Sequence, residues 1–193
     1  RPCPVVGMIG VIDDVTMAIG NRFVAADEDI FILGQNDSQK DGWLGASLYA
    51  AHQGITEIYA PPPIDLDAEE QTGKLLAKMI ASGTVTAAHD ISDGGLAVTI
   101  AEMCLHSSFG AEITPPTGGH LHGWAFGEDQ ARYVVTSADG PALTIAAQKA
   151  SIAISKIGKV TSKAELQFGD DDTISVKDLK NVSEACLPNL MVG

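Results

Sequence analysis

Two carboxylates and two glycines stand close together in residues 89–95, which read HDISDGG, near the middle of the chain. The apolar residues before this segment predict a strand, and those after it predict a buried helix, so the segment forms the turn between them. Glycine lets a ligand approach the backbone closely, and the free N–H groups of a first helical turn can face phosphate oxygens. Asp90 or Asp93 could then hold Mg²⁺ against that phosphate.

The same residue types also make an ordinary turn between a strand and a helix. In that interpretation Ser92 or Asp93 caps the helix, the glycines only shape the turn, and Asp90 is solvated. The residue chemistry alone favours this second interpretation.

A triplet of polar side chains, Glu128, Asp129 and Gln130, stands immediately before an apolar strand that is predicted for residues 131–137. If strand geometry already holds in the triplet, Glu128 and Gln130 face one side and Asp129 the other. Residues at the start of a strand can project into a cleft, and Arg132 can pair with one of the acids. On spacing alone, a cleft-facing triplet and a solvated strand entry with a surface ion pair are equally supported.

Histidines and cysteines give weaker signals. His120 and His122 lie near His106, but no cysteine or third ligand follows at a spacing typical of a metal site, and we predict no metal binding there. The three cysteines are far apart and form no Cys-x-x-Cys pair. They predict neither a disulfide framework nor a thiol nucleophile, and they fit a reducing cytoplasm.

The composition limits the kinds of partner. The chain has 193 residues, with 25 acidic against 12 basic residues and a formal net charge of −13. This acidic excess argues against a protein that holds nucleic acid through its phosphates. No apolar run approaches the ~18 to 20 residues that cross a bilayer, so we expect no membrane partner. With 45% hydrophobic residues, the chain is long enough for one domain with its own core.

The elements that position these residues are a mixture of strands and helices. Strands are predicted at 4–12, 29–33, 84–88, 110–113, 131–137, 156–161 and 173–176, and helices at 45–52, 96–105 and 141–154. The best-marked helix lies between Asp65 or Asp67, either of which can cap it, and Gly83, which stops it. Strands that both alternate with helices and follow one another predict an α+β protein with α/β layers, in which a mixed β-sheet packs against helices.

The start of the chain predicts a connection to an upstream domain. The first four residues, RPCP, include no initiator Met and lead at once into a nearly continuous apolar run. Because such a run suits a strand that is covered on both faces, we expect a piece cut from a longer polypeptide. Residues 1–14 are then a linking strand from a missing upstream domain, and residues 15–193 are the domain itself.

Taken together, these motifs resemble the C-terminal part of the phosphoribosylformylglycinamidine synthase family. The resemblance rests first on residues 88–97 (AHDISDGGLA) with 101–103 (AEM), and on residues 126–135 (FGEDQARYVV). Residues 4–10, 42–49 and 187–193 resemble the strand that leads into that part, its small-residue helix start and its carboxyl end. The resemblance implies the fold of the AIR synthase-related C-terminal domain.

The resemblance also implies an ATP-dependent amidation in purine biosynthesis. ATP phosphorylates the amide oxygen of formylglycinamide ribonucleotide, and ammonia released from glutamine elsewhere displaces the phosphate to give formylglycinamidine ribonucleotide. Mg²⁺ would neutralise the transferring phosphoryl group, so catalysis would rest on positioning and electrostatics. The implied partners are the upstream domains of the same synthetase, a glutaminase subunit, a small accessory subunit and small-molecule nucleotides, in the cytoplasm.

The family's synthetase has two pseudo-equivalent halves, and this chain resembles only the last C-terminal domain. In the first half, the counterpart of Asp90 is a magnesium ligand, and the counterparts of residues 128–130 contact substrate. The resemblance therefore implies a metal ligand at Asp90. It implies substrate or nucleotide contacts at Glu128, Asp129, Gln130, Gly94 and Gly95, and it assigns no catalytic residue.

Two positions depart from the family pattern. Ala46 stands where a second glycine is common, and Leu48 stands where an acid is frequent, which argues against a polar role for that helix start. The main magnesium and nucleotide ligands of the second half lie upstream of these residues. We therefore predict that the isolated chain has no synthetase activity.

Two other functions stay open. The chain can be a structural domain that docks a subunit without touching ligand, or an ATP-using relative that is similar to thiamine-monophosphate kinase or selenophosphate synthetase. Ordered phosphate or Mg²⁺ beside Gly94 and Gly95 would favour ligand contact. The phosphoryl acceptor that supports ATP turnover would identify a kinase.

Overall fold

The computed structural model describes residues 5–34, 42–55, 60–170 and 172–191. Its described strands form a seven-stranded sheet in the order β2-β4-β1-β5-β3-β6-β7. The strands are β1 (Asp29–Leu33), β2 (Ala87–Asp90), β3 (Gly110–Ile113), β4 (Tyr133–Ser137), β5 (Ile154–Thr161), β6 (Glu165–Phe168) and β7 (Asp172–Ser175). The helices are η1 (Val15–Met17), α1 (Leu48–His52), α2 (Leu66–Ala81), α3 (Gly95–Leu105), α4 (Leu121–Phe126), α5 (Gly140–Lys149) and α6 (Val176–Met191).

The sheet is mixed, which confirms the predicted α+β class. Neighbouring strands are antiparallel except β3 and β6, which run parallel. The central strand β1 is buried on both faces because successive side chains of a strand point to opposite sides. Ile30 and Ile32 join one apolar cluster, and Phe31 and Leu33 join the other. Its apolar residues therefore contribute to two separate cores.

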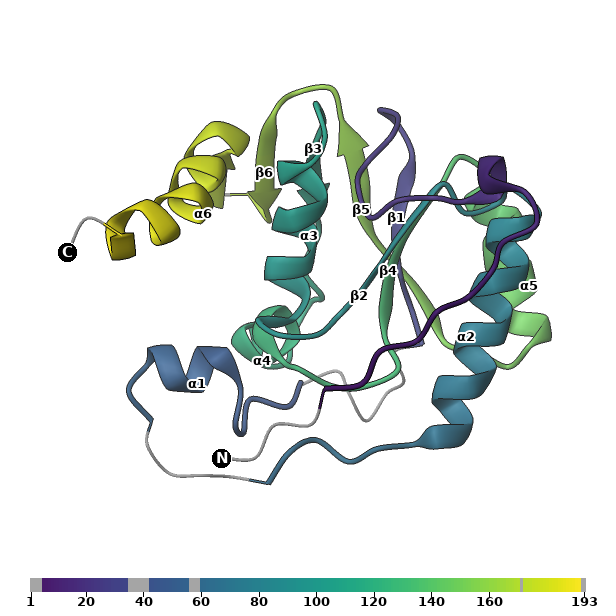
Figure 1. Cartoon of the computed structure of the whole chain (residues 1–193), viewed down its shortest axis with the longest axis horizontal. Coiled ribbons are helices and arrows are strands. Elements are labelled where there is room, and N and C mark those ends of the chain that lie inside the picture. Colours follow the sequence, from purple (N-terminus) through teal and green to yellow (C-terminus); the bar gives the residue numbers. More distant parts are fainter. Residues whose placement is uncertain (1–4, 35–41, 56–59, 171, 192–193) are drawn as a thin grey trace.

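Helices cover both faces of this sheet (Figure 1). On one side α3, α4 and α6 supply buried side chains such as Leu96, Ile100 and Trp124. On the other side α2 and α5 supply residues such as Leu75 and Leu143. Helix α3 is apolar on most of its surface, as expected for a helix that packs between the sheet and other helices. None of the helices in the described part of the chain is long and apolar enough to span a membrane.

Helix α2 begins and ends where its sequence signals predicted. The side chain of Asp65 accepts a hydrogen bond from the Ala68 amide at 3.0 Å and caps the helix. Acids occupy the first turn and Lys78 the last, and Gly83 follows in the left-handed region with φ of 71°. These local features mark both ends of the helix, while Leu75, Leu76 and Met79 pack it against the core.

The strand predicted at the start of the chain is wrong for this structure. Residues 5–12 form no strand, and Val5 and Ile9 are 93% and 100% exposed. A strand needs a neighbour for its backbone hydrogen bonds, and no described residue of the chain pairs with this segment. Whether residues 1–14 belong to an upstream domain stays a prediction.

Four elements were missed by the sequence prediction, and the first of them is the short helix η1. Helix α4 begins at Leu121, shortly after Gly118 and Gly119. Strand β6 is only four residues long. Helix α6 does carry a capping signal, because the hydroxyl of Ser175 accepts a hydrogen bond from the Asp178 amide and donates one to its carboxylate.

Candidate functional site

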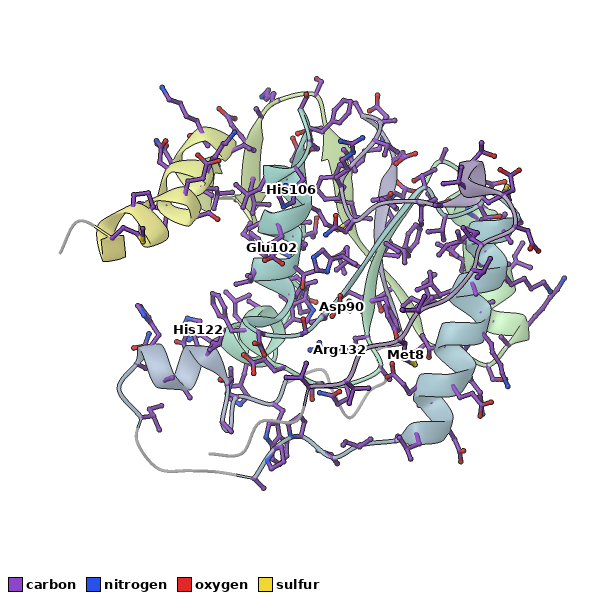
Figure 2. The ribbon with its side chains drawn as sticks, viewed as in Figure 1. Met8, Asp90, Glu102, His106, His122 and Arg132 are labelled. Atoms are coloured by element: carbon purple, nitrogen blue, oxygen red, sulfur yellow. The ribbon has the colours of Figure 1, made fainter. Side chains whose placement is uncertain are left out.

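The two polar motifs of the sequence lie next to each other at one end of the sheet. Strands β2 and β4 pair so that Asp90 stands opposite Tyr133, and the Ile91 amide then donates to the Arg132 carbonyl at 2.9 Å. This pairing joins the 90–95 turn to the 127–132 loop. Figure 2 shows Asp90 and Arg132 near each other, where β2 leaves the sheet toward α3.

Glu128 links the beginnings of two helices. Its Oε1 accepts a hydrogen bond of 2.8 Å from the Gly94 amide and another of 2.8 Å from the Leu48 amide. Gly94 is the residue that caps α3, and Leu48 is the first residue of α1. A carboxylate is favoured at both places because the amino-terminal end of a helix carries partial positive charge.

The predicted cap of α3 by Ser92 or Asp93 is wrong. Gly94 occupies the cap position with φ of 83°, and no side chain of that turn caps the helix. Instead Glu128, 34 residues further along the chain, accepts the Gly94 amide. A side chain at Gly94 would also collide with Val98, so the position requires glycine for two reasons.

Asp129 and Arg132 form a buried ion pair. They are 6% and 1% exposed, and Arg132 Nη2 lies 3.3 Å from Asp129 Oδ2. The same carboxylate oxygen accepts from the Trp43 amide at 3.0 Å, and Arg132 Nη2 donates to the Gly127 carbonyl at 2.7 Å. The alternative of a surface ion pair is therefore wrong, because water does not reach this pair.

Burial sets the electrostatics of Arg132. Loss of solvent lowers the pKa of the guanidinium from its usual value, and the negative charge of Asp129 opposes that change. The second terminal nitrogen, Nη1, is buried and has no hydrogen-bond partner in the structure. The pair thus rests on one carboxylate and on backbone carbonyls.

Strand geometry does not extend into the 128–130 triplet. Strand β4 begins only at Tyr133, and Ala131 has a φ of 59°, which breaks the extended conformation. Glu128 and Asp129 both turn toward the backbone of residues 42–48, while Gln130 is exposed. The condition on which the alternation of the triplet depended is therefore not met.

The other predicted ligand residues divide into exposed and buried groups. The Asp90 side chain is exposed, and its Oδ1 lies 3.2 Å from His89 Nδ1. The other ring nitrogen of His89, Nε2, lies 3.3 Å from Glu102 Oε2. Ser92 and Asp93 are also exposed, whereas Gly94 and Gly95 are buried. The outer half of the turn is open to a ligand, and its inner half packs against the 126–128 backbone.

The residues around Asp90 could supply part of a cation site but not all of its ligands. Within the described residues, no group of three or more His, Cys, Asp or Glu side chains lies close enough to hold a metal ion. A cation at Asp90 would therefore need further oxygen ligands from water, from a nucleotide or from another domain.

Two open cavities adjoin the segment that Glu128 and Asp129 hold. One of about 360 Å³ is lined by Gly42, Trp43, Leu44, Gly45, Tyr49, Ala50 and Ile55. The other, of about 540 Å³, is lined by Gly42, Leu44, Gly119, His120, Leu121, His122 and Gly123. Helix α1 packs on α4 through Tyr49. The Tyr49 ring stacks on Phe126, and the Tyr49 hydroxyl lies 3.3 Å from His122 Nδ1.

Sequence reasoning missed the backbone partners of the triplet. The amides of Trp43 and Leu48 bind the two carboxylates, although the Leu48 side chain is exposed and apolar. Ala46 has a φ of 59°, in the left-handed region that favours glycine. The departures at Ala46 and Leu48 therefore do not remove the polar role of this helix start, which belongs to the backbone.

Cys104 lies where its thiol is unreactive. Cys104 is free and buried in the core, and burial raises the pKa of its thiol to about 12. At neutral pH the thiol is protonated, and a thiolate nucleophile is therefore not available there.

Comparison with known sequences gives close relatives along the whole chain. It is 40% identical over 195 residues to phosphoribosylformylglycinamidine synthase subunit PurL of Rhodopseudomonas palustris, and 40% identical over 194 residues to the same subunit of Methylocella silvestris. In both comparisons the match covers 100% of this chain and 26% of the relative. The chain therefore spans about a quarter of the length of these relatives.

Comparison with solved structures shows the same fold. Thermotoga maritima PurL complexed with ATP matches 86% of this chain and 28% of that chain, with a TM-score of 0.64 and 18% identity. A thiamine-monophosphate kinase from Stenotrophomonas maltophilia matches 79% of this chain and 53% of that chain, with a TM-score of 0.53 and 18% identity.

The family described as AIR synthase related protein, C-terminal domain, matches residues 26–171. This range includes every strand from β1 to β6 and both polar motifs. The chain belongs to the AIR synthase-related proteins and carries their C-terminal domain.

Proposed function

We propose that this chain is the last C-terminal domain of a phosphoribosylformylglycinamidine synthase. The observation that carries the proposal is the 40% identity to PurL subunits over the whole length of the chain. The complete protein would convert formylglycinamide ribonucleotide to formylglycinamidine ribonucleotide in purine biosynthesis, in the cytoplasm. It would use ATP and ammonia, and Mg²⁺ would neutralise the phosphoryl group when bound.

Within that protein the domain would form one wall of a composite cleft. Asp90 and Gln130 are exposed members of the two adjoining motifs, as are Ser92 and Asp93, and this exposure supports the proposal that Asp90 and Gln130 meet a nucleotide or substrate. Asp90 would supply one oxygen ligand to a cation. The remaining ligands would come from the upstream domains and the nucleotide itself.

Glu128, Asp129, Gly94 and Gly95 have internal roles that need no ligand. The Gly94 amide already donates to Glu128, and Asp129 is held by Arg132 and the Trp43 amide. We propose that these residues keep the wall in shape. Direct contact of any of them with substrate or nucleotide stays a prediction.

The test of this function uses the full-length synthetase with Asp90→Asn and Gln130→Ala. We expect each variant to raise the KM for ATP or for formylglycinamide ribonucleotide, or to lower kcat, in the ammonia-dependent reaction. Glu112→Gln, at the exposed position of β3, is a control that should leave these constants unchanged. Unchanged turnover and nucleotide binding in both site variants would remove the ligand-contact roles.

A second function is a bracing and docking domain. The internal use of Glu128 and Asp129 favours it, because two of the acids expected to meet substrate already hold the protein together. In that case Asp90→Asn and Gln130→Ala are silent, while disruption of the domain still weakens assembly with the glutaminase and small accessory subunits. Phosphorylation of a different acceptor by ATP would instead support a kinase-like relative.

The isolated 193-residue chain is expected to be inactive. Most of the proposed cation and nucleotide ligands would lie upstream, and the described residues contain no complete ligand set. ATP hydrolysis that depends on formylglycinamide ribonucleotide and is catalysed by the purified chain would falsify this expectation.

A further inference from the structure

A groove runs between α2 and α5, on the side of the sheet away from α3 (Figure 1). Its volume is about 710 Å³. The groove is lined by Gln71, Lys74, Leu75, Lys78, Met79, Ala142, Ile145, Ala146, Lys149, Ala150 and Ile152. Its floor is apolar, since Leu75, Met79 and Ile152 belong to the core beneath it, and Ile145 is half exposed above it.

The charge of this groove is opposite to that of the chain. The protein has 25 acidic and 12 basic residues, yet three lysines line the groove and none of its described lining residues is acidic. Lys74 pairs with Glu70 on its own helix, whereas Lys78 and Lys149 have no ion pair within the described residues. The two unpaired lysines stand in the last turns of α2 and α5.

Stabilisation by the helix dipole explains why a lysine stands near the carboxyl end of each helix. It does not explain why the groove between the two helices has no acidic lining residue within the described part of the chain. Elsewhere on the chain Lys156 meets Asp29 at 2.6 Å and Lys159 meets Asp27 at 3.7 Å, while Lys163 and Lys177 have no ion pair within the described residues. The groove differs in that three lysines line it and none of its described lining residues is acidic. An apolar floor with unpaired cations at its edge is complementary to an amphipathic helix whose polar face is acidic.

We propose that the α2–α5 groove docks an acidic amphipathic helix of a partner protein. Apolar side chains of that helix would lie on Leu75, Met79 and Ala146, and its carboxylates would meet Lys78 and Lys149. A symmetric contact with a second copy is disfavoured, because the groove would then face a second groove whose charged lining residues are also all lysines. A nucleotide is disfavoured because the groove is open, whereas small-molecule sites enclose most of their ligand.

The experiment rests on the proposed function, because it takes as partners the glutaminase and small accessory subunits proposed above. Full-length synthetase is reconstituted with these subunits, and the dissociation constant of assembly is measured by calorimetry at low and high salt. Glutamine-dependent and ammonia-dependent turnover are measured on the same samples. The test variant is Lys78→Glu with Lys149→Glu.

A matched control carries Lys163→Glu with Lys177→Glu. These lysines are also exposed, they have no ion pair within the described residues, and the change in net charge is the same. We expect the groove variant to raise the dissociation constant at least about tenfold, since two favourable charge contacts become repulsive. Its glutamine-dependent turnover falls at limiting partner, and its ammonia-dependent turnover stays at the wild-type value.

Each outcome decides one question. An unchanged dissociation constant in the groove variant, or an equal change in the control, would overturn the docking proposal. A higher KM for ATP in the ammonia-dependent reaction would overturn it in favour of a nucleotide site. Absence of ammonia-dependent turnover in the wild type would count against the proposed function, while the comparison of dissociation constants would still test the groove.

Discussion

At the residue scale, Glu128 accounts for how the two helix starts are held together. Its Oε1 accepts the amides of both Gly94 and Leu48, so its loss leaves two backbone donors without partners. We expect Glu128→Ala to lower the free energy of unfolding by about 2 to 4 kcal/mol, because each bond involves a charged acceptor. Glu128→Gln should lose less, since its amide oxygen still accepts.

Urea unfolding of the chain measures both variants of Glu128. Glu112→Ala removes an acid from an exposed strand position with no described ion pair, and it should change stability by less than about 0.5 kcal/mol. If Glu128→Ala behaves like this control, then the two hydrogen bonds contribute nothing and the cap is incidental.

The buried pair of Asp129 and Arg132 gives a second prediction at this scale. Burial already lowers the pKa of Arg132, and Asp129 is the charge that opposes this. Removing either partner alone leaves a buried charge uncompensated, so Arg132→Met and Asp129→Ala should each cost about 3 to 5 kcal/mol. The double variant should cost clearly less than the sum of the two, with a coupling of about 1 to 3 kcal/mol.

Chemical denaturation of all four species closes that thermodynamic cycle. Additive losses would mean that the 3.3 Å contact carries no specific energy and that each residue acts through its own backbone contacts. Should the single variants fail to fold, the milder pair Arg132→Lys and Asp129→Asn gives the same comparison.

At the element scale, two backbone positions are expected to respond in opposite directions to glycine and alanine. Gly73 lies in the middle of α2, and a Cβ there would meet nothing within 4 Å. Gly73→Ala should stabilise the chain by about 1 kcal/mol through helix propensity. Ala46 has φ of 59° in the turn before α1, so Ala46→Gly should relieve about 1 kcal/mol of strain.

Thermal unfolding distinguishes these effects from a general response to the substitutions. Ala77→Gly, at an exposed position of α2, is the control, and it should destabilise the chain by about 1 kcal/mol. A loss of stability in Ala46→Gly of the same size would show that the turn before α1 carries no strain.

How far the sequence predicts these elements depends on how local their determinants are. Helix α2 was predicted because Asp65 and the dipole-favoured charges lie within the helix itself. The pairing of Arg132 with an acid was predicted for the same reason, since Asp129 is three residues away. The amides of Trp43 and Leu48 were not predicted, because the residues that they bind lie 86 and 80 positions away.

The same argument explains why neither the cap of α3 nor the first strand was predicted correctly. The turn before α3 contains two residues that commonly cap helices, but the tertiary fold brings Glu128 there instead. Residues 5–12 have the composition of a strand, yet whether a strand forms depends on a neighbour that the described chain does not contain. Composition predicts whether a segment can be buried. The assembled fold decides which neighbour the segment packs against.

At the scale of the whole molecule, the apolar segment 5–12 should change behaviour with its surroundings. Its large side chains are exposed in this chain, and Figure 2 labels Met8 on this segment. In a strand, Ile9 and Met8 would point to opposite faces. Because both faces are apolar, a strand in the complete protein would be covered on both.

We therefore expect substitutions in this segment to have opposite effects in the two contexts. In the 193-residue chain, Ile9→Lys or Met8→Lys should reduce self-association measured by sedimentation, without lowering the unfolding temperature, since neither side chain is buried. In the full-length synthetase, each should destabilise by about 2 kcal/mol or more, because a charge would enter an apolar layer. Lys163→Glu, remote from the segment, serves as the neutral control in both. If the full-length protein tolerates both lysines, the segment is not a covered strand; if it tolerates only one, a single face is buried.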